Sequence, residues 1–172
     1  MIKKISIIGT ESSGKTGLAA KLAEHYKTIY VPDYSRTYIQ MLERKYNHSD
    51  VLKIAEGIIE QEDKMAHLAH RILITDNDLV NIKIWLRYYK WPVPDWLEKD
   101  IITRLPDLYL LCEPDIPWVG DEQRQNAHDR MELFHQFREE LAAINANFKS
   151  ITGFGVERLE MAVSTVDELL MY

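Results

Sequence analysis

The sequence lacks the features that define disulfide-stabilised, membrane-spanning and secreted proteins. Cysteine occurs once in 172 residues, as Cys112, so no disulfide can form within the chain and a reducing compartment is indicated. No apolar run approaches the ~18 residues that a membrane span needs. The apolar stretch after Lys3 and Lys4 is too short for a secretory signal and lacks a small-residue cleavage site. These absences predict a cytoplasmic protein with no membrane partner.

Basic charge is also scarce. The 21 Lys and Arg residues face 27 Asp and Glu residues, a formal net charge of -6, and no run of basic residues is long enough to follow a phosphodiester backbone. Nucleic acid is therefore not expected as a partner. Apolar residues make up 46% and charged residues 28%, which is typical of a globular domain. The length predicts a single domain over residues 1–172 and leaves the oligomeric state open.

Short apolar runs alternate with longer segments of helical period, and no internal repeat interrupts them. This pattern predicts an α/β fold with a five-stranded parallel sheet and helices on both faces. The predicted strands are Ile5–Ile8, Thr28–Val31, Ile72–Thr75, Leu108–Cys112 and Phe148–Ile151. The predicted helices are Lys15–Tyr26, Arg36–Lys45, Ser49–His70, Asp78–Lys90, Pro94–Arg104, Ala127–Asn145 and Thr165–Leu170. Capping residues are expected at Ser49 and at Ser164.

The segment Gly9-Thr10-Glu11-Ser12-Ser13-Gly14-Lys15-Thr16 matches the P-loop pattern G-x-x-x-x-G-K-S/T at every fixed position. It follows a predicted strand and opens a predicted helix, which is the context that the motif needs. Its backbone N–H groups and the helix N-terminus are expected to hold the phosphates of ATP. Lys15 is expected to reach the β- and γ-phosphates, and the Thr16 hydroxyl to bind Mg²⁺. The nucleotide-binding residues are predicted to be Gly9, Glu11, Ser12, Ser13, Gly14, Lys15 and Thr16.

Carboxylates follow the predicted strands at the edge where a parallel sheet binds ligands. Asp76 is predicted to bind Mg²⁺, directly or through water. Asp78 is either a substrate contact or the N-cap of the next helix, and the two roles are compatible. Asp33 is predicted to accept the proton of a substrate hydroxyl, with a helix cap as the alternative. Arg36 is expected to contact substrate or phosphate.

The region of about residues 114–130 contains turn formers and no clear period, which predicts a lid loop over the phosphates. Arg124 and Arg130 are its candidate catalytic groups, because guanidinium groups stabilise the charge of phosphoryl transfer. A solvated charged loop is the alternative. A cluster of aromatic residues could stack on a substrate ring, although such clusters are more often core: Trp85, Tyr88, Tyr89, Trp91 and Trp96.

Five blocks of this sequence resemble the ribosylnicotinamide kinase domain of NadR-like proteins, a branch of the P-loop kinases sometimes grouped with AAA-type ATPases. The blocks occur in the family's order: Gly9–Thr16, Asp33–Tyr38, Asp76–Val80, Pro117–Arg124 and Ile151–Arg158. The resemblance implies transfer of the γ-phosphate of ATP to the 5′-hydroxyl of nicotinamide riboside. It also implies that the segment from Gly153 to Arg158 lies near the adenine, and that Trp118 contacts the substrate.

Two departures from the family are visible. Family members often have Glu where this chain has Asp33, so the geometry of the base is expected to differ. NadR proteins also carry an adenylyltransferase domain, for which this chain has no room, so kinase chemistry alone is expected. Two alternatives remain open: a kinase for another nucleoside or metabolite, and an ATP-binding module that hydrolyses slowly. A guanine-specific switch is disfavoured because no Asn-Lys-x-Asp segment is present.

Overall fold

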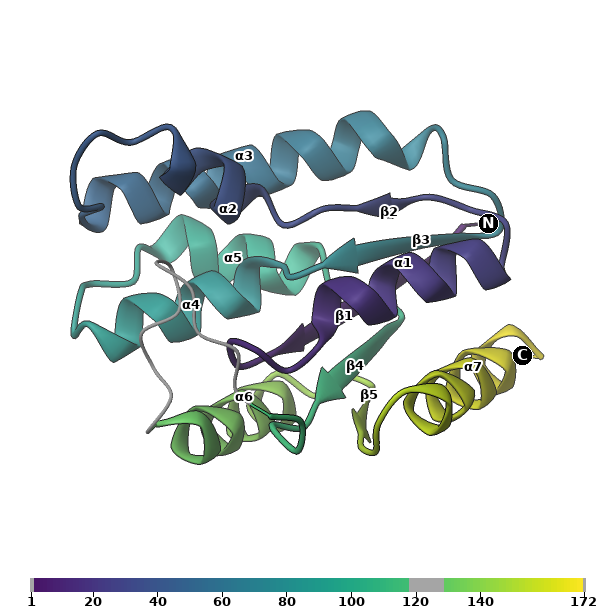
Figure 1. Ribbon diagram of the computed structural model, residues 1–172. Coiled ribbons are helices and arrows are strands. Elements are labelled where there is room, and N and C mark those ends of the chain that lie inside the picture. Colours follow the sequence, from purple (N-terminus) through teal and green to yellow (C-terminus); the bar gives the residue numbers. More distant parts are fainter. Residues whose placement is uncertain (1, 118–128, 172) are drawn as a thin grey trace.

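A five-stranded parallel sheet forms the centre of the fold (Figure 1). The computed structural model describes residues 2–117 and 129–171. The strand order is β2-β3-β1-β4-β5, and each neighbouring pair is parallel. The strands are β1 (Lys3–Gly9), β2 (Tyr30–Val31), β3 (Ile72–Asp76), β4 (Leu108–Cys112) and β5 (Phe148–Ile151). The predicted fold class is confirmed, with β2 shorter than expected.

Helices connect the strands, because each crossover in a parallel sheet needs a longer segment than a hairpin does. None of the helices in the described ranges is both long and apolar enough to cross a bilayer. The helices are α1 (Lys15–His25), α2 (Tyr34–Gln40), α3 (His48–Ala66), α4 (Leu79–Tyr88), α5 (Asp95–Thr103), α6 (Arg130–Ala143) and α7 (Val156–Leu170).

The sheet buries one hydrophobic cluster on each face. Along β1 the side chains alternate, so that Ile5 and Ile7 pack with α1 and α7, whereas Ile8 packs with the cluster that includes α3, α4, α5 and α6. All three isoleucines are fully buried. Burial on both faces explains the apolar runs of β3 and β4, whose residues are all buried, whereas the edge strand β5 is only partly buried.

The strand register places the carboxyl ends of β1, β3 and β4 next to one another. Ile7 of β1 pairs with Asp76 of β3, and Gly9 pairs with Cys112 of β4. Because the strands are parallel, their carboxyl ends lie at the same edge of the sheet. The loop that leaves β1 therefore begins between the ends of β3 and β4.

Helix α7 begins nine residues earlier than predicted, at Val156 instead of Thr165. The expected cap at Ser164 is wrong, because Thr165 lies within the helix and its hydroxyl donates to the Met161 carbonyl at 2.8 Å. The buried residues Arg158, Ala162 and Val166 recur every four positions and define the helical face. A charged residue at the first of these positions obscured the pattern.

Two other helix starts also differ from the prediction. Helix α3 is capped by Asn47 instead of Ser49, in a capping box with Asp50. Helix α2 begins at Tyr34, because the Asp33 carboxylate accepts the Ser35 N–H at 3.0 Å.

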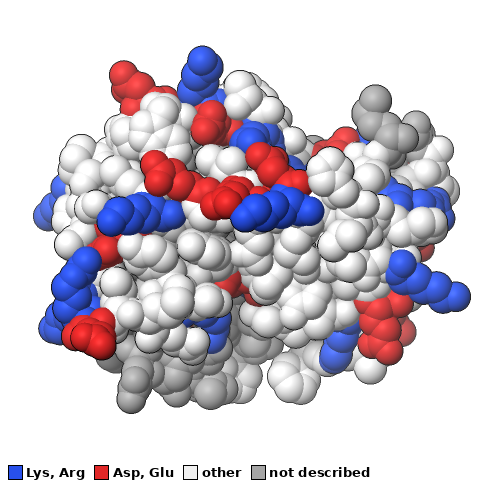
Figure 2. Space-filling view, turned by 90° about the horizontal axis from the view of Figure 1, so that it is seen from above, with Lys and Arg blue, Asp and Glu red and all other residues white. Residues whose placement is uncertain are grey.

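The surface seen from above carries both signs of charge. Figure 2 shows Lys and Arg side chains interspersed with Asp and Glu side chains on this face. Ion pairs such as Arg104–Asp63, at 2.8 Å, and Lys64–Glu60, at 2.5 Å, keep opposite charges adjacent. The face drawn there presents no broad surface of one charge.

Gly57 of α3 allows a test of the contact between α3 and Tyr34, the first residue of α2. A Cβ atom at Gly57 would lie 2.0 Å from Cε1 of Tyr34, the first residue of α2. Gly57→Ala is therefore expected to lower the free energy of unfolding by about 1–3 kcal/mol, because overpacking outweighs the better helix propensity of alanine. Urea denaturation measures the change.

Gly17→Ala is the matched control, because a Cβ atom added to this helical glycine would have no neighbouring atom within 4 Å. It is expected to raise stability by up to about 1 kcal/mol. Equal stability changes in the two variants would contradict the packing of Tyr34 on Gly57.

Candidate functional site

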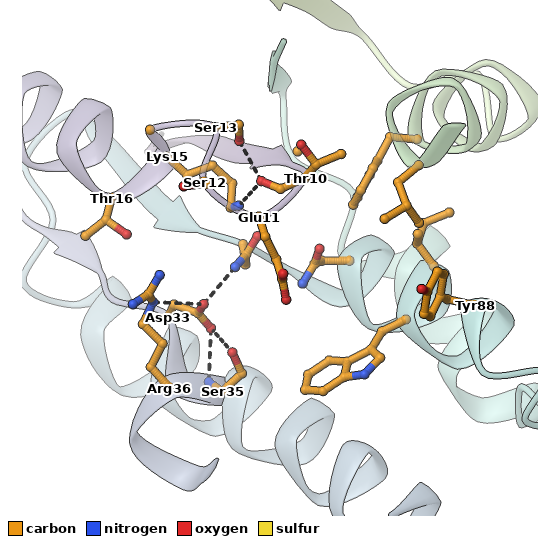
Figure 3. Close-up of a pocket in the computed structure, with 18 of the residues that line it drawn as sticks. Thr10, Glu11, Ser12, Ser13, Lys15, Thr16, Asp33, Ser35, Arg36 and Tyr88 are labelled. Carbon is orange, nitrogen blue, oxygen red and sulfur yellow. Dashed lines mark hydrogen bonds and ion pairs between the residues drawn. The ribbon is translucent and has the colours of Figure 1, made fainter. Parts of the chain in front are cut away.

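The phosphate loop, residues 9–16, is held in shape by its own side chains and by two glycines. Gly9 has a φ of 146°, and a Cβ atom there would lie 2.7 Å from the Cys112 carbonyl oxygen. Gly14, with a φ of 79°, caps α1. The Ser13 hydroxyl and the Lys15 ammonium both donate to the Thr10 carbonyl, at 2.7 and 2.8 Å. The loop therefore closes on itself at the foot of α1 (Figure 3).

The start of α1 suits an anion. The first turn of the helix contains no acidic residue, so the positive end of the helix dipole is not offset within that turn. Lys15 adds a full positive charge at the same place. A loop of backbone N–H groups at a helix N-terminus, joined by an ammonium group, is the arrangement that binds phosphate.

Thr16 and Asp76 meet at the position expected of a metal site. The Thr16 hydroxyl donates to Oδ2 of Asp76 at 2.5 Å, and Asp76 is only 4% exposed. Burial raises the pKa of the Asp76 carboxyl above its usual range, and the nearby Lys15 ammonium opposes the shift. Oδ1 of Asp76 has no hydrogen-bond partner within the described ranges. A buried oxygen of this kind next to a hydroxyl fits a magnesium ion, which needs few protein ligands when phosphates supply the rest.

Asp33 is both a helix cap and a wall of the cavity. Its Oδ1 accepts the Ser35 N–H at 3.0 Å and the Ser35 hydroxyl at 2.6 Å. Its Oδ2 accepts the Asn77 amide at 2.9 Å and lies 4.0 Å from Nε of Arg36. Figure 3 shows Asp33 and Arg36 across the cavity from the phosphate loop. The cap alternative is therefore correct, and the same carboxylate stays available to a ligand.

A cavity of about 270 Å³ lies between the phosphate loop and Asp33. Four aromatic residues line it, and three of them are here called the aromatic wall: Tyr46, Trp85 and Tyr88. Tyr46 and Trp85 pack edge to face, with ring centroids 5.0 Å apart. A hydrogen bond to Asp129, with burial, raises the pKa of Tyr88 to about 12, so Tyr88 remains a neutral donor. Of the aromatic cluster singled out in the sequence, Trp85 and Tyr88 reach the cavity.

Several predicted contacts are not made in the cavity. Asp78 does not line it, because its carboxylate caps α4 through the Val80 N–H at 2.9 Å and is buried beside Tyr109. Arg130 and Arg158 bind backbone carbonyls of the phosphate loop from outside. Gly153 does not line the cavity either. Asp78 and Arg158 thus bind protein groups here, and their ligand contacts stay predictions, whereas Arg124 and Trp118 lie outside the described residues.

Several polar or aromatic residues that line the cavity were not predicted as site residues from the sequence, among them Tyr46, Asn77 and Asn81. Asn77 carried a signal, because it directly follows Asp76 and Asn tolerates the positive φ of 72° found there. Asn81 is the third residue of α4, in the first turn of that helix. Tyr46 lies in the connection between α2 and α3 and carried no recognisable signal.

The parallel sheet, the phosphate loop after its central strand, and the Thr16–Asp76 pair define the class: a P-loop protein with the fold of the P-loop kinases. A family model described as an AAA domain matches residues 4–158, and the chain belongs to that family. This match, together with the NadR relatives and structures below, confirms the resemblance seen in the motifs.

One curated relative is the trifunctional NAD biosynthesis/regulator protein NadR of Escherichia coli (strain K12). It is 29% identical over 153 residues, which cover 86% of this chain and 37% of that protein. The chain thus spans about a third of the length of the curated relatives it matches.

Solved structures show the same fold. A NadR protein in complex with NAD and AMP-PNP gives a TM-score of 0.82 at 19% identity, covering 99% of this chain and 50% of that one. A NadR protein in complex with NR gives 0.79 at 18% identity, covering 98% and 51%.

Proposed function

We propose that this chain is an ATP-dependent kinase that phosphorylates a hydroxyl group of a nucleoside, with the 5′-hydroxyl of nicotinamide riboside as its preferred acceptor. One observation carries the proposal. The phosphate loop and the Asp33 carboxylate line the same cavity, so a triphosphate end and an acceptor hydroxyl can meet in it. A protein that only bound ATP would not need a proton acceptor facing the phosphates.

The phosphate loop, the Thr16–Asp76 pair and Asp33 have separate roles in the proposed transfer. The N–H groups of the phosphate loop and Lys15 would hold the β- and γ-phosphates, and Thr16 with Asp76 would hold Mg²⁺. When bound, Mg²⁺ offsets the negative charge of the phosphates. Asp33 accepts the proton as the acceptor oxygen forms its bond to the γ-phosphorus. The bond from that phosphorus to the bridging oxygen breaks, and ADP leaves with the bond's electrons.

Asn77 and Ser35 fix the orientation of the proposed base, and Arg36 lies beside it. The Asn77 amide donates to Oδ2 of Asp33, and the Ser35 groups donate to Oδ1, so the carboxylate is held in one orientation. Arg36 stands 4.0 Å from Oδ2 and is 44% exposed, which leaves its guanidinium able to turn towards a phosphate or a ribose hydroxyl. The base is therefore preorganised while its neighbouring cation stays adaptable.

The aromatic part of the cavity suits a flat ring that carries positive charge. The aromatic wall supplies three rings, and Glu11 extends from the phosphate loop into the same cavity (Figure 3). The Glu11 carboxylate is close enough to add to the raised pKa values of Tyr46 and Tyr88. Aromatic faces with a nearby carboxylate favour organic cations. The pyridinium ring of nicotinamide riboside is such a cation, and the relative bound to NR supports the choice.

A nucleoside panel tests the proposal. The protein is incubated with Mg-ATP and with nicotinamide riboside, its neutral dihydro form, uridine, cytidine or deoxyadenosine, and ADP release is followed. Nicotinamide riboside is expected to stimulate release most strongly. If a neutral nucleoside is preferred, the kinase class stands and the named acceptor is wrong. If no acceptor stimulates ADP release, the kinase proposal is wrong.

Glu11→Gln tests the charge preference of the cavity. The substitution is expected to raise KM for nicotinamide riboside by about fivefold to tenfold, as for one partly solvated charge pair. The KM for a neutral nucleoside and for ATP should change little, because glutamine keeps the shape of the side chain. Steady-state kinetics with both acceptors measure the ratio. An equal change for the cationic and the neutral acceptor would contradict a charge-reading role.

A further inference from the structure

Arg158, at the start of α7, is buried and joins three separate segments of the chain. It is 6% exposed. One terminal nitrogen donates to Oδ1 of Asp115 at 2.7 Å and to the Gly153 carbonyl at 2.9 Å. The other donates to the Ser13 carbonyl at 2.8 Å and to the Glu113 carbonyl at 3.0 Å. The guanidinium thus ties the phosphate loop to the segment after β4 and to the loop before α7.

The contact with Ser13 fixes the direction of a neighbouring N–H group. In a trans peptide the C=O and the following N–H point in opposite directions across one plane. Because Arg158 holds the Ser13 carbonyl on the α7 side, the N–H of Gly14 is directed the other way. Ser13 and Gly14 both line the cavity. A bond on the outside of the loop therefore sets a donor on its inside.

Arg130 makes the same kind of contact one residue earlier. It donates to the Ser12 carbonyl at 3.1 Å and to the Ile116 carbonyl at 3.2 Å. By the same peptide geometry, the N–H of Ser13 is directed away from Arg130. Two consecutive carbonyls of the loop are therefore held from outside, by arginines of α6 and α7.

Asp115 completes the arrangement. While its Oδ1 accepts from Arg158, its Oδ2 accepts the Gly153 N–H at 2.7 Å. Asp115 is one-third exposed, at 33%, whereas Arg158 is buried, so the carboxylate orients the guanidinium from the solvent side. Without it, the guanidinium would lose its only charged partner within the described ranges, and with it the orientation that directs it to the Ser13 carbonyl.

We propose that Arg158 and Asp115 are positioning residues for nucleotide binding, which set the inward N–H of Gly14 through the Ser13 carbonyl. The proposal rests on the proposed function, because it assumes that the loop binds a phosphate chain. It assigns Arg158 no contact with the nucleotide. The arginine acts through the backbone, and its effect depends on Asp115.

The direction in which Asp115→Asn changes the affinity for Mg-ATP distinguishes this positioning role from direct phosphate binding. If Arg158 bound phosphate itself, removing the negative charge of Asp115 would leave ATP binding unchanged or strengthen it. If Arg158 acts as a positioning residue, Asp115→Asn weakens binding, because the guanidinium that holds the Ser13 carbonyl is no longer oriented. The two roles therefore predict different outcomes for the same variant.

The test is calorimetric titration with Mg-ATP of the full chain and of Arg158→Lys and Asp115→Asn. Each variant is expected to raise Kd for Mg-ATP about tenfold, the effect of losing a hydrogen bond made by a charged group. The acceptor KM should stay within about twofold, since neither residue lines the cavity. The double variant should bind little worse than either single one, because both changes release the same guanidinium contact.

Arg104→Lys and Asp63→Asn are the matched controls, because Arg104 makes a two-pronged contact with Asp63, at 2.8 and 2.9 Å, away from the cavity. Both should bind Mg-ATP as the unaltered chain does. Unchanged or tighter binding by Asp115→Asn would overturn the positioning role while the proposed function stands. No binding of Mg-ATP by the unaltered chain would overturn both.

Discussion

Replacing Lys15 with alanine is expected to abolish measurable phosphoryl transfer, with a loss of at least about a thousandfold in kcat/KM. The reason is position as well as charge. The Lys15 ammonium lies across the phosphate loop, 2.8 Å from the Thr10 carbonyl, and no other lysine lines the cavity within the described ranges. ADP release in the presence of the acceptor measures the effect.

Lys21→Ala is the control for this loss. Lys21 lies on the same helix, α1, and its side chain is exposed away from the cavity lining. Its replacement should leave kcat/KM within about twofold, as for most exposed surface residues. Substantial transfer by Lys15→Ala would mean that the triphosphate is bound elsewhere than in residues 9–16.

Asp33→Asn is expected to lower kcat by about a hundredfold or more while ATP binding is retained, as for loss of a general base. Asparagine is as good a helix cap as aspartate, so α2 should keep its start and the fold should persist. The variant therefore removes the proton acceptor with little change of shape. Kinetics and calorimetric titration with Mg-ATP separate the two effects.

Ser35→Ala is the companion to this variant. The Ser35 hydroxyl donates to Oδ1 of Asp33 at 2.6 Å, so its loss alters the orientation of the base and leaves the carboxylate in place. The expected loss in kcat is about tenfold, well below that of Asp33→Asn. If Asp33→Asn turned over at the rate of the unaltered chain, Asp33 would have no part in the chemistry.

The parts of the site that could be predicted from the sequence are those set by local pattern. The phosphate loop lies within eight consecutive residues, and its strand and helix flank it directly, so the motif and its context could be recognised together. Asp76 followed from the rule that carboxyl ends of parallel strands meet at one edge. The structure places Asp76 against Thr16, which the sequence separates by 60 positions.

The parts that could not be predicted depend on contacts between distant segments. Tyr46 comes from an irregular connection, and its contacts with Trp85 and Tyr89 of the distant α4 region hold it at the cavity. Arg158 acts on backbone carbonyls, which have no sequence signature because every residue carries one. Its motif suggested a ligand contact, whereas its bonds run to the protein itself. A short motif indicates where a residue lies more reliably than what its side chain binds.

Aspartate at position 33, where the resemblance implies that glutamate is common, has a local explanation. As the N-cap of α2, the short side chain accepts the Ser35 N–H two residues ahead. The one carboxylate thus fixes the start of the helix and faces the cavity. The Asn77 amide reaches the same oxygen that Arg36 approaches, so the base is supported by two elements.

A crystal structure of the chain with a non-hydrolysable ATP analogue, Mg²⁺ and nicotinamide riboside tests the central claim most directly. The account predicts the triphosphate within residues 9–16, the metal at Thr16 and Asp76, and the 5′-hydroxyl of the riboside within hydrogen-bonding distance of Asp33. A triphosphate bound outside the phosphate loop, or an acceptor hydroxyl turned away from Asp33 with the γ-phosphate out of reach, would contradict it.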